Sequence, residues 1–335
     1  MIDVRTVLPI FGLVVLTTAI TLPGRAQTAT PDKADQEDVI RVTTTLVTVP
    51  ISVMDRNGRF IPDLKKDQFQ LFEDGAAQQI AFFDNSESPF TVALLLDVSD
   101  STVKQLAQIK AAATAFVNEL RPDDRVLILT FDQRVTLVSS PTSDRSVLEQ
   151  SIAHVQSGGG TSLYDALDLT IVKHLKQIRG RKAIVLFTDG VDTTSRGATY
   201  ESTLRKAEEL DALIYGIKYE TYNDVSNGQS TARAEEMKTQ VVTSRGEPLD
   251  VAYKRAGQYL QHLSDKSAGR LYYAASLNHL REIFSRIAAE LRQQYSLGYY
   301  PTNKSNDKKQ RQLRVRVSVP NVALRYRRAY VYAAQ

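Results

Sequence analysis

The sequence predicts an α/β fold with a doubly wound, mostly parallel sheet and helices on both of its faces. Four apolar runs of strand length lie at Val92–Leu96, Val126–Phe131, Ala183–Phe187 and Leu213–Ile217. These runs are apolar almost throughout, which is typical of strands that are covered on both faces. Amphipathic stretches separate them, as expected for the helices that connect parallel strands. Segments with alternating apolar residues flank this region, and we predict that they form a small β-sandwich around it.

The amphipathic stretches predict the helices. In the first, apolar residues recur from Val103 through Phe116 to Leu120 at the spacing that places them on one helical face. Further helices are predicted at Ser143–Val155, Ser162–Ile178, Thr199–Leu210, Tyr259–Ala268 and Leu277–Leu291. The polar stretch 220–250 interrupts this order after the fourth apolar run. Because long loops inside compact domains are usually functional or disordered, it is predicted either to select a partner or to be disordered.

The two ends of the chain carry the alternation of strands that have one exposed face. Apolar residues occupy every second position from Val47 to Val53 and again from Leu313 to Val319. Neither end has enough strands to bury a full core, so we predict that they pair with each other. Residues 40–88 and 296–335 would then be two parts of one β-sandwich, with the α/β domain, residues 89–295, inserted between them.

The first 26 residues have the features of a secretion signal. Arg5 precedes a mostly apolar stretch, Val7–Leu22, and small residues lead to a cleavage position after Ala26. The apolar stretch is shorter than the ~20 residues that span a bilayer, so no stable transmembrane span is expected after cleavage; the alternative is a retained anchor. Residues 27–39 are polar and predict a disordered leader. The protein is therefore expected to be exported, to the periplasm or to the cell exterior.

Composition excludes several classes of function. The chain has no cysteine, which excludes disulfides, a thiol nucleophile and a lipid-bearing cysteine. A net charge of +4 over 335 residues is too small to indicate a nucleic-acid partner. The four histidines lack the spacing of a catalytic zinc site, and the glycine-rich loop lacks the Gly-Lys-Ser/Thr of a phosphate-binding loop. The sequence therefore does not predict an enzyme.

Oxygen-bearing side chains follow two of the predicted strands and open one of the predicted helices. Asp97, Ser99 and Ser101 come directly after the first apolar run, and Asp189 follows the third. Thr161 ends a glycine-rich loop that leads into a helical stretch. Hard divalent cations such as Mg²⁺ prefer oxygen ligands and retain water. The five side chains therefore predict a magnesium site, with Mn²⁺ or Ca²⁺ as alternatives, in which one position stays open for an outside oxygen.

The pattern of this site resembles the metal-ion-dependent adhesion site of the von Willebrand factor A-type domain. That site has the form Asp-x-Ser-x-Ser, a distant Thr and a distant Asp, and all five positions match here. The resemblance covers roughly residues 90–295, and the whole chain is similar to secreted bacterial proteins that carry such a domain between short β segments. It implies that the strands ending at Asp97 and Asp189 are neighbours, with the metal at the carboxyl edge of the sheet.

The resemblance implies an exported, metal-dependent binding module of the adhesion type. Its partner would be a protein that offers an Asp or Glu carboxylate to the metal. Asp165 and Asp192 lie near the ligands in the sequence, and we expect them to support the ligands or a helix N-terminus without binding the ion directly. Two alternatives stay open: a metal-independent assembly or scaffold protein of the cell envelope, and a Mg²⁺-dependent hydrolase built on Asp97.

Overall fold

The computed structural model describes residues 46–85, 88–219, 221, 242–274, 277–303, 305 and 309–332. The predicted signal peptide, the predicted leader and most of the stretch 220–250 lie outside these residues. Within them, no helix has both the length and the apolar character that crossing a membrane requires.

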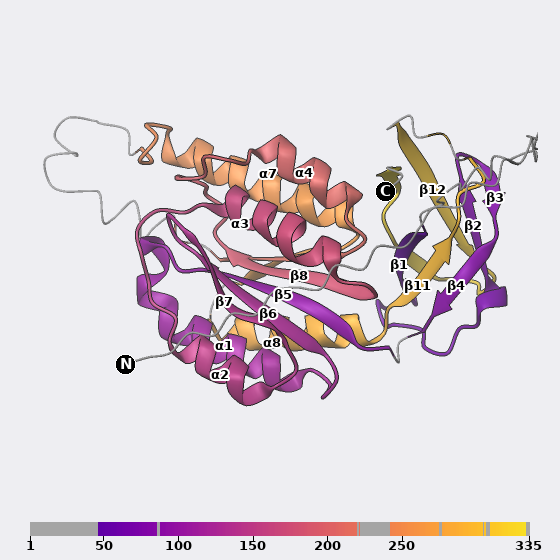
Figure 1. Ribbon diagram of the computed structural model, residues 1–335, viewed down its shortest axis with the longest axis horizontal. Coiled ribbons are helices and arrows are strands. Elements are labelled where there is room, and N and C mark those ends of the chain that lie inside the picture. The colour runs from indigo at the N-terminus through magenta and orange to yellow at the C-terminus, as the bar shows by residue number, and fades with distance from the viewer. Residues whose placement is uncertain are drawn as a thin grey trace, which may run out of the picture. The chain divides into compact units, whose positions relative to one another are not determined.

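A six-stranded sheet forms the centre of the α/β region, in the order β10-β9-β8-β5-β6-β7 (Figure 1). Its strands are β5 (Phe90–Asp97), β6 (Arg125–Phe131), β7 (Val135–Thr142), β8 (Arg181–Thr188), β9 (Leu213–Tyr219) and β10 (Arg270–Ala274). All neighbours are parallel except β6 and β7, which are antiparallel. The predicted fold class is confirmed, and the four apolar runs are β5, β6, β8 and β9.

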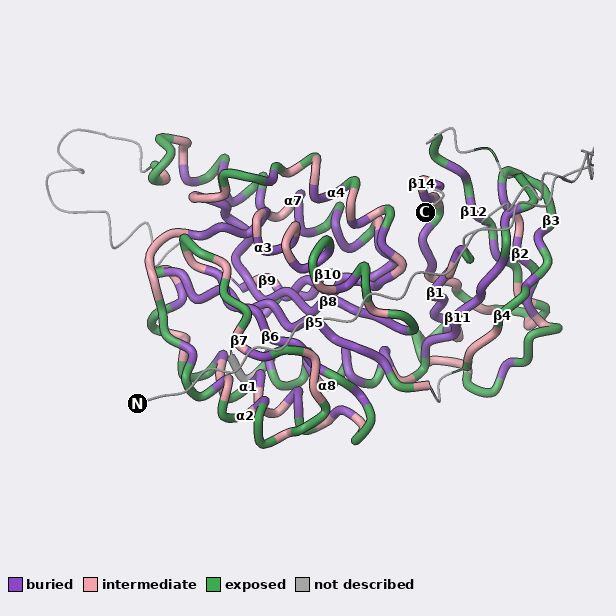
Figure 2. The backbone as a smooth tube through the Cα atoms, viewed as in Figure 1, coloured by how far each residue is buried: buried purple, intermediate pink, exposed green. Residues whose placement is uncertain are grey.

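Helices cover both faces of this sheet. They are α1 (Leu106–Glu119), α2 (Arg145–Ala153), α3 (Leu163–Leu169), α4 (Tyr200–Glu209), α7 (Leu249–Ser267) and α8 (Leu277–Arg292). In β5, Val92, Leu94 and Leu96 share a core with α1, α2 and α8, whereas Ala93 and Leu95 share one with α3, α4 and α7. Successive side chains of a strand point to opposite faces, so an apolar run without alternation is what a sheet between two helix layers requires. Figure 2 shows these central strands as buried along their length.

Three details differ from the sequence prediction. Val103 was expected on a buried stripe, but it lies in a 3₁₀ segment, Asp100–Gln105, and is 49% exposed. Helix α7 begins at Leu249, ten residues before the predicted start, because its first turns also bury apolar residues. Strands β7 and β10 were not predicted. Both lie at the edges of the sheet, and only one of the eight residues of β7 is buried, so neither carries the continuous apolar run that marks the central strands.

Strands from the two ends of the chain pair with each other. One sheet has the order β13-β1-β11-β4 and another the order β14-β12-β2-β3. Their strands are β1 (Val47–Met54), β2 (Phe69–Glu73), β3 (Ala76–Gln78), β4 (Ile80–Asp84), β11 (Tyr295–Tyr299), β12 (Gln310–Val317), β13 (Ala323–Arg325) and β14 (Ala329–Val331). Strand β1 pairs with β11 and β13, and β2 pairs with β12. Apolar residues of both sheets share one core, separate from the two cores of the α/β region.

Substitution by alanine is expected to have opposite effects on stability at two glycines, Gly269 and Gly257. A Cβ atom at Gly269 would lie 1.9 Å from the carbonyl oxygen of Ile214, which is backbone and cannot rotate away. Gly257 lies inside α7, and a Cβ there would meet no atom within 4 Å. We expect Gly269→Ala to lower the free energy of unfolding by about 1–3 kcal/mol and Gly257→Ala to raise it by about 0.5–1 kcal/mol. Urea unfolding of both variants measures this, and equal effects would contradict the packing described for Gly269.

Candidate metal centre

The candidate site lies at the carboxyl edge of the central sheet. Strands β5 and β8 are parallel neighbours, paired from Phe90 with Arg181 to Leu96 with Phe187. Asp97 is the last residue of β5, and Asp189 directly follows β8. The expectation that these two strands are neighbours is therefore confirmed. Crevices beyond the carboxyl ends of parallel strands are where α/β sheets collect ligands.

Two serine hydroxyls that lie next to each other bring four of the five predicted ligands together. The Ser99 hydroxyl donates to Oδ1 of Asp97 at 2.6 Å, and the Ser99 and Ser101 hydroxyl oxygens are 3.1 Å apart. The Ser101 hydroxyl donates to Oδ2 of Asp189 at 3.3 Å. The fifth residue, Thr161, lines the same cavity as Ser99, Ser101 and Asp189; its volume is about 230 Å³. The fold thus brings together residues that are up to 92 positions apart.

The glycine-rich loop is fixed in place by its backbone. The amide of Gly158 donates to the carbonyl oxygen of Val98 at 2.9 Å, which joins the loop to the segment after β5. Gly160 has a φ of +75°, and a Cβ there would lie 2.7 Å from the side chain of Thr194. The amide of Thr161 donates to the Thr193 hydroxyl at 2.9 Å. Only glycine adopts this conformation at so little cost, so the glycines bring Thr161 to the cavity.

Burial raises the pKa of both carboxylates of the site. Asp97 is fully buried and Asp189 is 3% exposed. Burial, and then the neighbouring charge of Asp189, raises the pKa of Asp97 to about 7, although hydrogen bonds from Ser99 and Thr188 oppose the shift. Burial also raises the pKa of Asp189, against hydrogen bonds from Thr221, Val191, Ser101 and Tyr253. A cation would relieve the cost of keeping two carboxylates ionised there.

The donor set fits a hard divalent cation. Ser99, Ser101, Thr161 and Asp189 line one cavity, and Asp97 accepts a hydrogen bond from Ser99. All five side chains are oxygen donors, as Mg²⁺ prefers. In the described part of the chain, no group of three or more His, Cys, Asp or Glu side chains could hold a metal. A cation here would therefore depend on hydroxyls and water as much as on carboxylates. Asp97, Ser99, Ser101, Thr161 and Asp189 are the residues that would hold it.

Comparison with known protein families agrees with this architecture. Residues 92–191, which run from β5 past Asp189, match the family described as the von Willebrand factor type A domain. The chain contains a von Willebrand factor type A domain. The match includes Asp97, Ser99, Ser101, Thr161 and Asp189.

Relatives of this chain include proteins without an assigned activity. An uncharacterized protein of Synechocystis sp., sll0103, is 31% identical over 106 residues, which are 30% of this chain and 25% of that protein. A UPF0353 protein of Mycobacterium sp. strain KMS is 25% identical over 221 residues, which are 60% of each chain. The chain therefore spans about a quarter of the first relative and less than two thirds of the second.

Solved structures similar to this chain include proteins of two bacteria. BatB from Bacteroides thetaiotaomicron, a conserved hypothetical protein, is 17% identical with a TM-score of 0.44, over 61% of this chain and 98% of that one. The vWF domain of the type V pili tip protein Mfa5 from Porphyromonas gingivalis is 13% identical with a TM-score of 0.44. It covers 60% of this chain and 94% of that one.

Several residues around the candidate metal centre were not predicted. The Thr188 hydroxyl donates to Oδ2 of Asp97 at 2.6 Å, and the Thr221 hydroxyl donates to Oδ2 of Asp189 at 2.6 Å. Tyr253, on α7, hydrogen bonds with Thr221 and donates to Asp189 at 3.4 Å. Thr188 directly precedes the predicted ligand Asp189 in the sequence, and this position could have indicated that it belongs to the site. Nothing in the sequence pattern indicated Thr221 or Tyr253, because the late start predicted for α7 left Tyr253 outside the helix.

The two additional aspartates organise the loop beside the cavity. Asp192 accepts hydrogen bonds from the amide of Tyr164 and from Ser195, and it forms an ion pair with Arg245 at 3.1 Å. Asp165 accepts hydrogen bonds from three consecutive amides, those of Arg196, Gly197 and Ala198. Neither lines the cavity that contains the predicted ligands. Their contacts fix the segment that follows Asp189.

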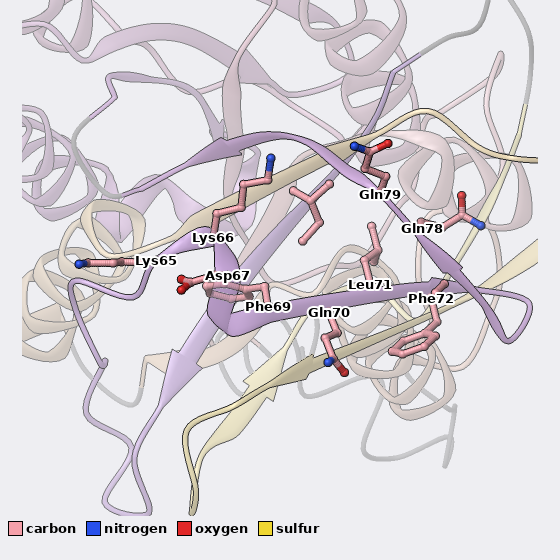
Figure 3. Close-up of a pocket in the computed structure, with 11 residues that line it drawn as sticks. Lys65, Lys66, Asp67, Phe69, Gln70, Leu71, Phe72, Gln78 and Gln79 are labelled. Carbon is pink, nitrogen blue, oxygen red and sulfur yellow. The ribbon is translucent and has the colours of Figure 1, made fainter.

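A larger cavity, of about 750 Å³, lies among the strands of the flanking sheets and contains none of the predicted ligands (Figure 3). Phe69 and Leu71 of β2 and Ile80 of β4 supply its apolar lining, and Lys65, Lys66 and Asp67 supply its charges. It opens where the chain leaves β3, paired with β2, and continues as β4, paired with β11. The five predicted metal ligands, all of them oxygen donors, therefore lie outside this larger cavity.

Proposed function

We propose that this protein is an exported, metal-dependent binding module of the adhesion type. Asp97, Ser99, Ser101, Thr161 and Asp189 would hold Mg²⁺, and a partner protein would bind by placing an Asp or Glu carboxylate beside the ion. The observation that carries the proposal is that Ser99 donates to Asp97, Ser101 donates to Asp189, and the two serine hydroxyl oxygens are only 3.1 Å apart. The matching domain type supports it.

The charge balance of the site favours a carboxylate as the outside ligand. Two protein carboxylates would neutralise a divalent ion, while the hydroxyls of Ser99, Ser101 and Thr161 add donors without adding charge. The ion would then stay electrophilic enough to attract one more oxygen anion. No nucleophile or general base is required, so the proposed activity is binding and not catalysis. Export follows from the predicted signal peptide, residues 1–26.

Thermal unfolding of residues 27–335 with EDTA and with Mg²⁺ tests the metal site. At about 100 times its dissociation constant, Mg²⁺ should raise the free energy of unfolding by ~2.7 kcal/mol, which is roughly 5–10 °C in melting temperature for a domain of this size. Asp97→Ala should remove this difference. Lys65→Ala, in the flanking strands, should keep it. An equal response of wild type and Asp97→Ala would refute a metal centre at these residues.

A further inference from the structure

A second cavity lies beside the candidate metal centre and is lined by arginine and tyrosine. Its volume is about 550 Å³. The lining includes the guanidinium-bearing residues Arg196, Arg245 and Arg255 and the aromatic residues Tyr164 and Tyr200. Tyr164 and Tyr200 are in edge contact with each other, with ring centroids 6.4 Å apart, which gives the cavity a packed aromatic wall. We call it the arginine cavity.

Two chain segments form the wall between the arginine cavity and the metal centre. In one segment, Thr193 lines the metal centre and Ser195 lines the arginine cavity. In the other, Ser244 lines the metal centre and Arg245 lines the arginine cavity. Because consecutive Cα atoms are about 3.8 Å apart, residues that line the two cavities lie within a few ångströms of each other along both segments. One short peptide segment can therefore reach both.

The arginines keep hydrogen-bond donors available. Arg245 uses one terminal nitrogen for Asp192 at 3.1 Å and for the carbonyl oxygen of Ser195 at 2.9 Å. Arg255 uses one terminal nitrogen for Glu247 at 2.7 Å. Their side chains remain 42% and 43% exposed. Each guanidinium has five N–H donors in a planar fork, so both arginines can donate hydrogen bonds to a further anion.

Arg196 differs from the other two arginines because its guanidinium is uncommitted within the described residues. It is exposed, and within the described residues its guanidinium has no ion pair or hydrogen bond. Its backbone is held by Asp165, so the residue is positioned without using its side chain. One acid, Glu201, also lines the cavity, and it sets a limit on how much anionic charge can bind. A single carboxylate suits this balance, since Arg–carboxylate pairs are frequently bidentate.

We propose that the arginine cavity binds a second carboxylate of the same protein partner that places a first carboxylate at the metal. This inference rests on the proposed function. The ligand is an acidic segment in which two Asp or Glu side chains are separated by a short spacer. The rings of Tyr164 and Tyr200 would contact the methylene groups of the second acidic side chain, and the arginines would bind its carboxylate. The partner would thus be selected by the spacing of two acids.

Two synthetic peptides with a fluorescent label test this selection by fluorescence polarisation in Mg²⁺. Both peptides end in a C-terminal amide, so that glutamate side chains are their only carboxylates. The single-acid probe is Gly-Glu-Gly-amide, and the paired-acid probe is Gly-Glu-Gly-Gly-Glu-Gly-amide. Hydrogen bonds to charged groups predict that wild type binds the paired probe about tenfold more tightly than the single probe. The variant with Arg196→Gln and Arg255→Gln should bind both probes equally, with its affinity for the single probe unchanged. The control with Arg125→Gln and Arg179→Gln removes the same charge at a different cavity and should keep the preference.

The outcomes separate this inference from the proposed function. If the single probe requires Mg²⁺ but the preference for the paired probe is absent, or persists in the Arg196 and Arg255 variant, the arginine cavity is not the second site. If neither probe requires Mg²⁺, the proposed function fails. Binding in EDTA then decides about the cavity: loss of the paired probe in the Arg196 and Arg255 variant supports an anion site, and equal binding refutes it.

Discussion

Glu73→Gln is expected to lower the free energy of unfolding by about 3–5 kcal/mol, because it leaves a buried positive charge without its partner. Glu73 and Arg311 are each 2% exposed and form an ion pair at 3.0 Å. The other carboxylate oxygen of Glu73 accepts hydrogen bonds from Tyr299 and Tyr330, both at 2.5 Å. Glutamine would keep the shape but replace one acceptor by an N–H donor that faces these groups.

Urea unfolding monitored by tyrosine fluorescence measures this effect, and an exposed ion pair supplies the control. Glu282 and Arg286 are one helical turn apart on α8, with side chains 55% and 63% exposed. Glu282→Gln should change the free energy of unfolding by no more than about 0.5 kcal/mol. The paired substitution Glu73→Leu with Arg311→Met should recover stability, since it removes both charges. A loss below about 1 kcal/mol for Glu73→Gln would contradict the burial of this pair.

The same ion pair shows where sequence reasoning reaches its limit. Glu73 ends β2, and Arg311 lies in β12, far along the chain. The alternation from Leu313 to Val319 indicated which residues face a core, because alternation depends on neighbouring positions only. It could not indicate that Arg311, on the same face, would be buried against an acid from the other end of the chain. Arg311 can be buried because Glu73 and the carbonyl oxygens of Asn303 and Ser305 satisfy its donors.

The candidate metal centre was more accessible to sequence reasoning because its parts follow recognisable elements. The run Val92–Leu96 ends at Asp97, and the run Ala183–Phe187 leads to Asp189, so both acids were placed at the carboxyl ends of strands. Their adjacency came from the family resemblance, because the order of parallel strands is not written in any local pattern. Thr221 and Tyr253 were missed for a related reason: their role depends on how α7 packs against the segment after β8.

Without a metal, wild-type protein is expected to become less stable as the pH rises from about 5 to about 8, by about 2–3 kcal/mol. Burial and the charge of Asp189 raise the pKa of Asp97 from 3.8 to about 7. Between these two values the folded state binds more protons at Asp97 than the unfolded state does, so stability decreases with pH in this window. Urea unfolding in EDTA across this range measures the slope.

Asp97→Asn should reduce this slope, because the amide has the shape of the protonated carboxyl and does not ionise. At about pH 8 in EDTA the variant should therefore be more stable than wild type, whereas in Mg²⁺ wild type should recover, since the ion binds the ionised carboxylate. Asp67→Asn removes an exposed carboxylate outside the α/β region and should keep the wild-type slope. If stability in EDTA is independent of pH, or rises with it, the buried pair of Asp97 and Asp189 does not carry the charge conflict that makes this site attract a cation.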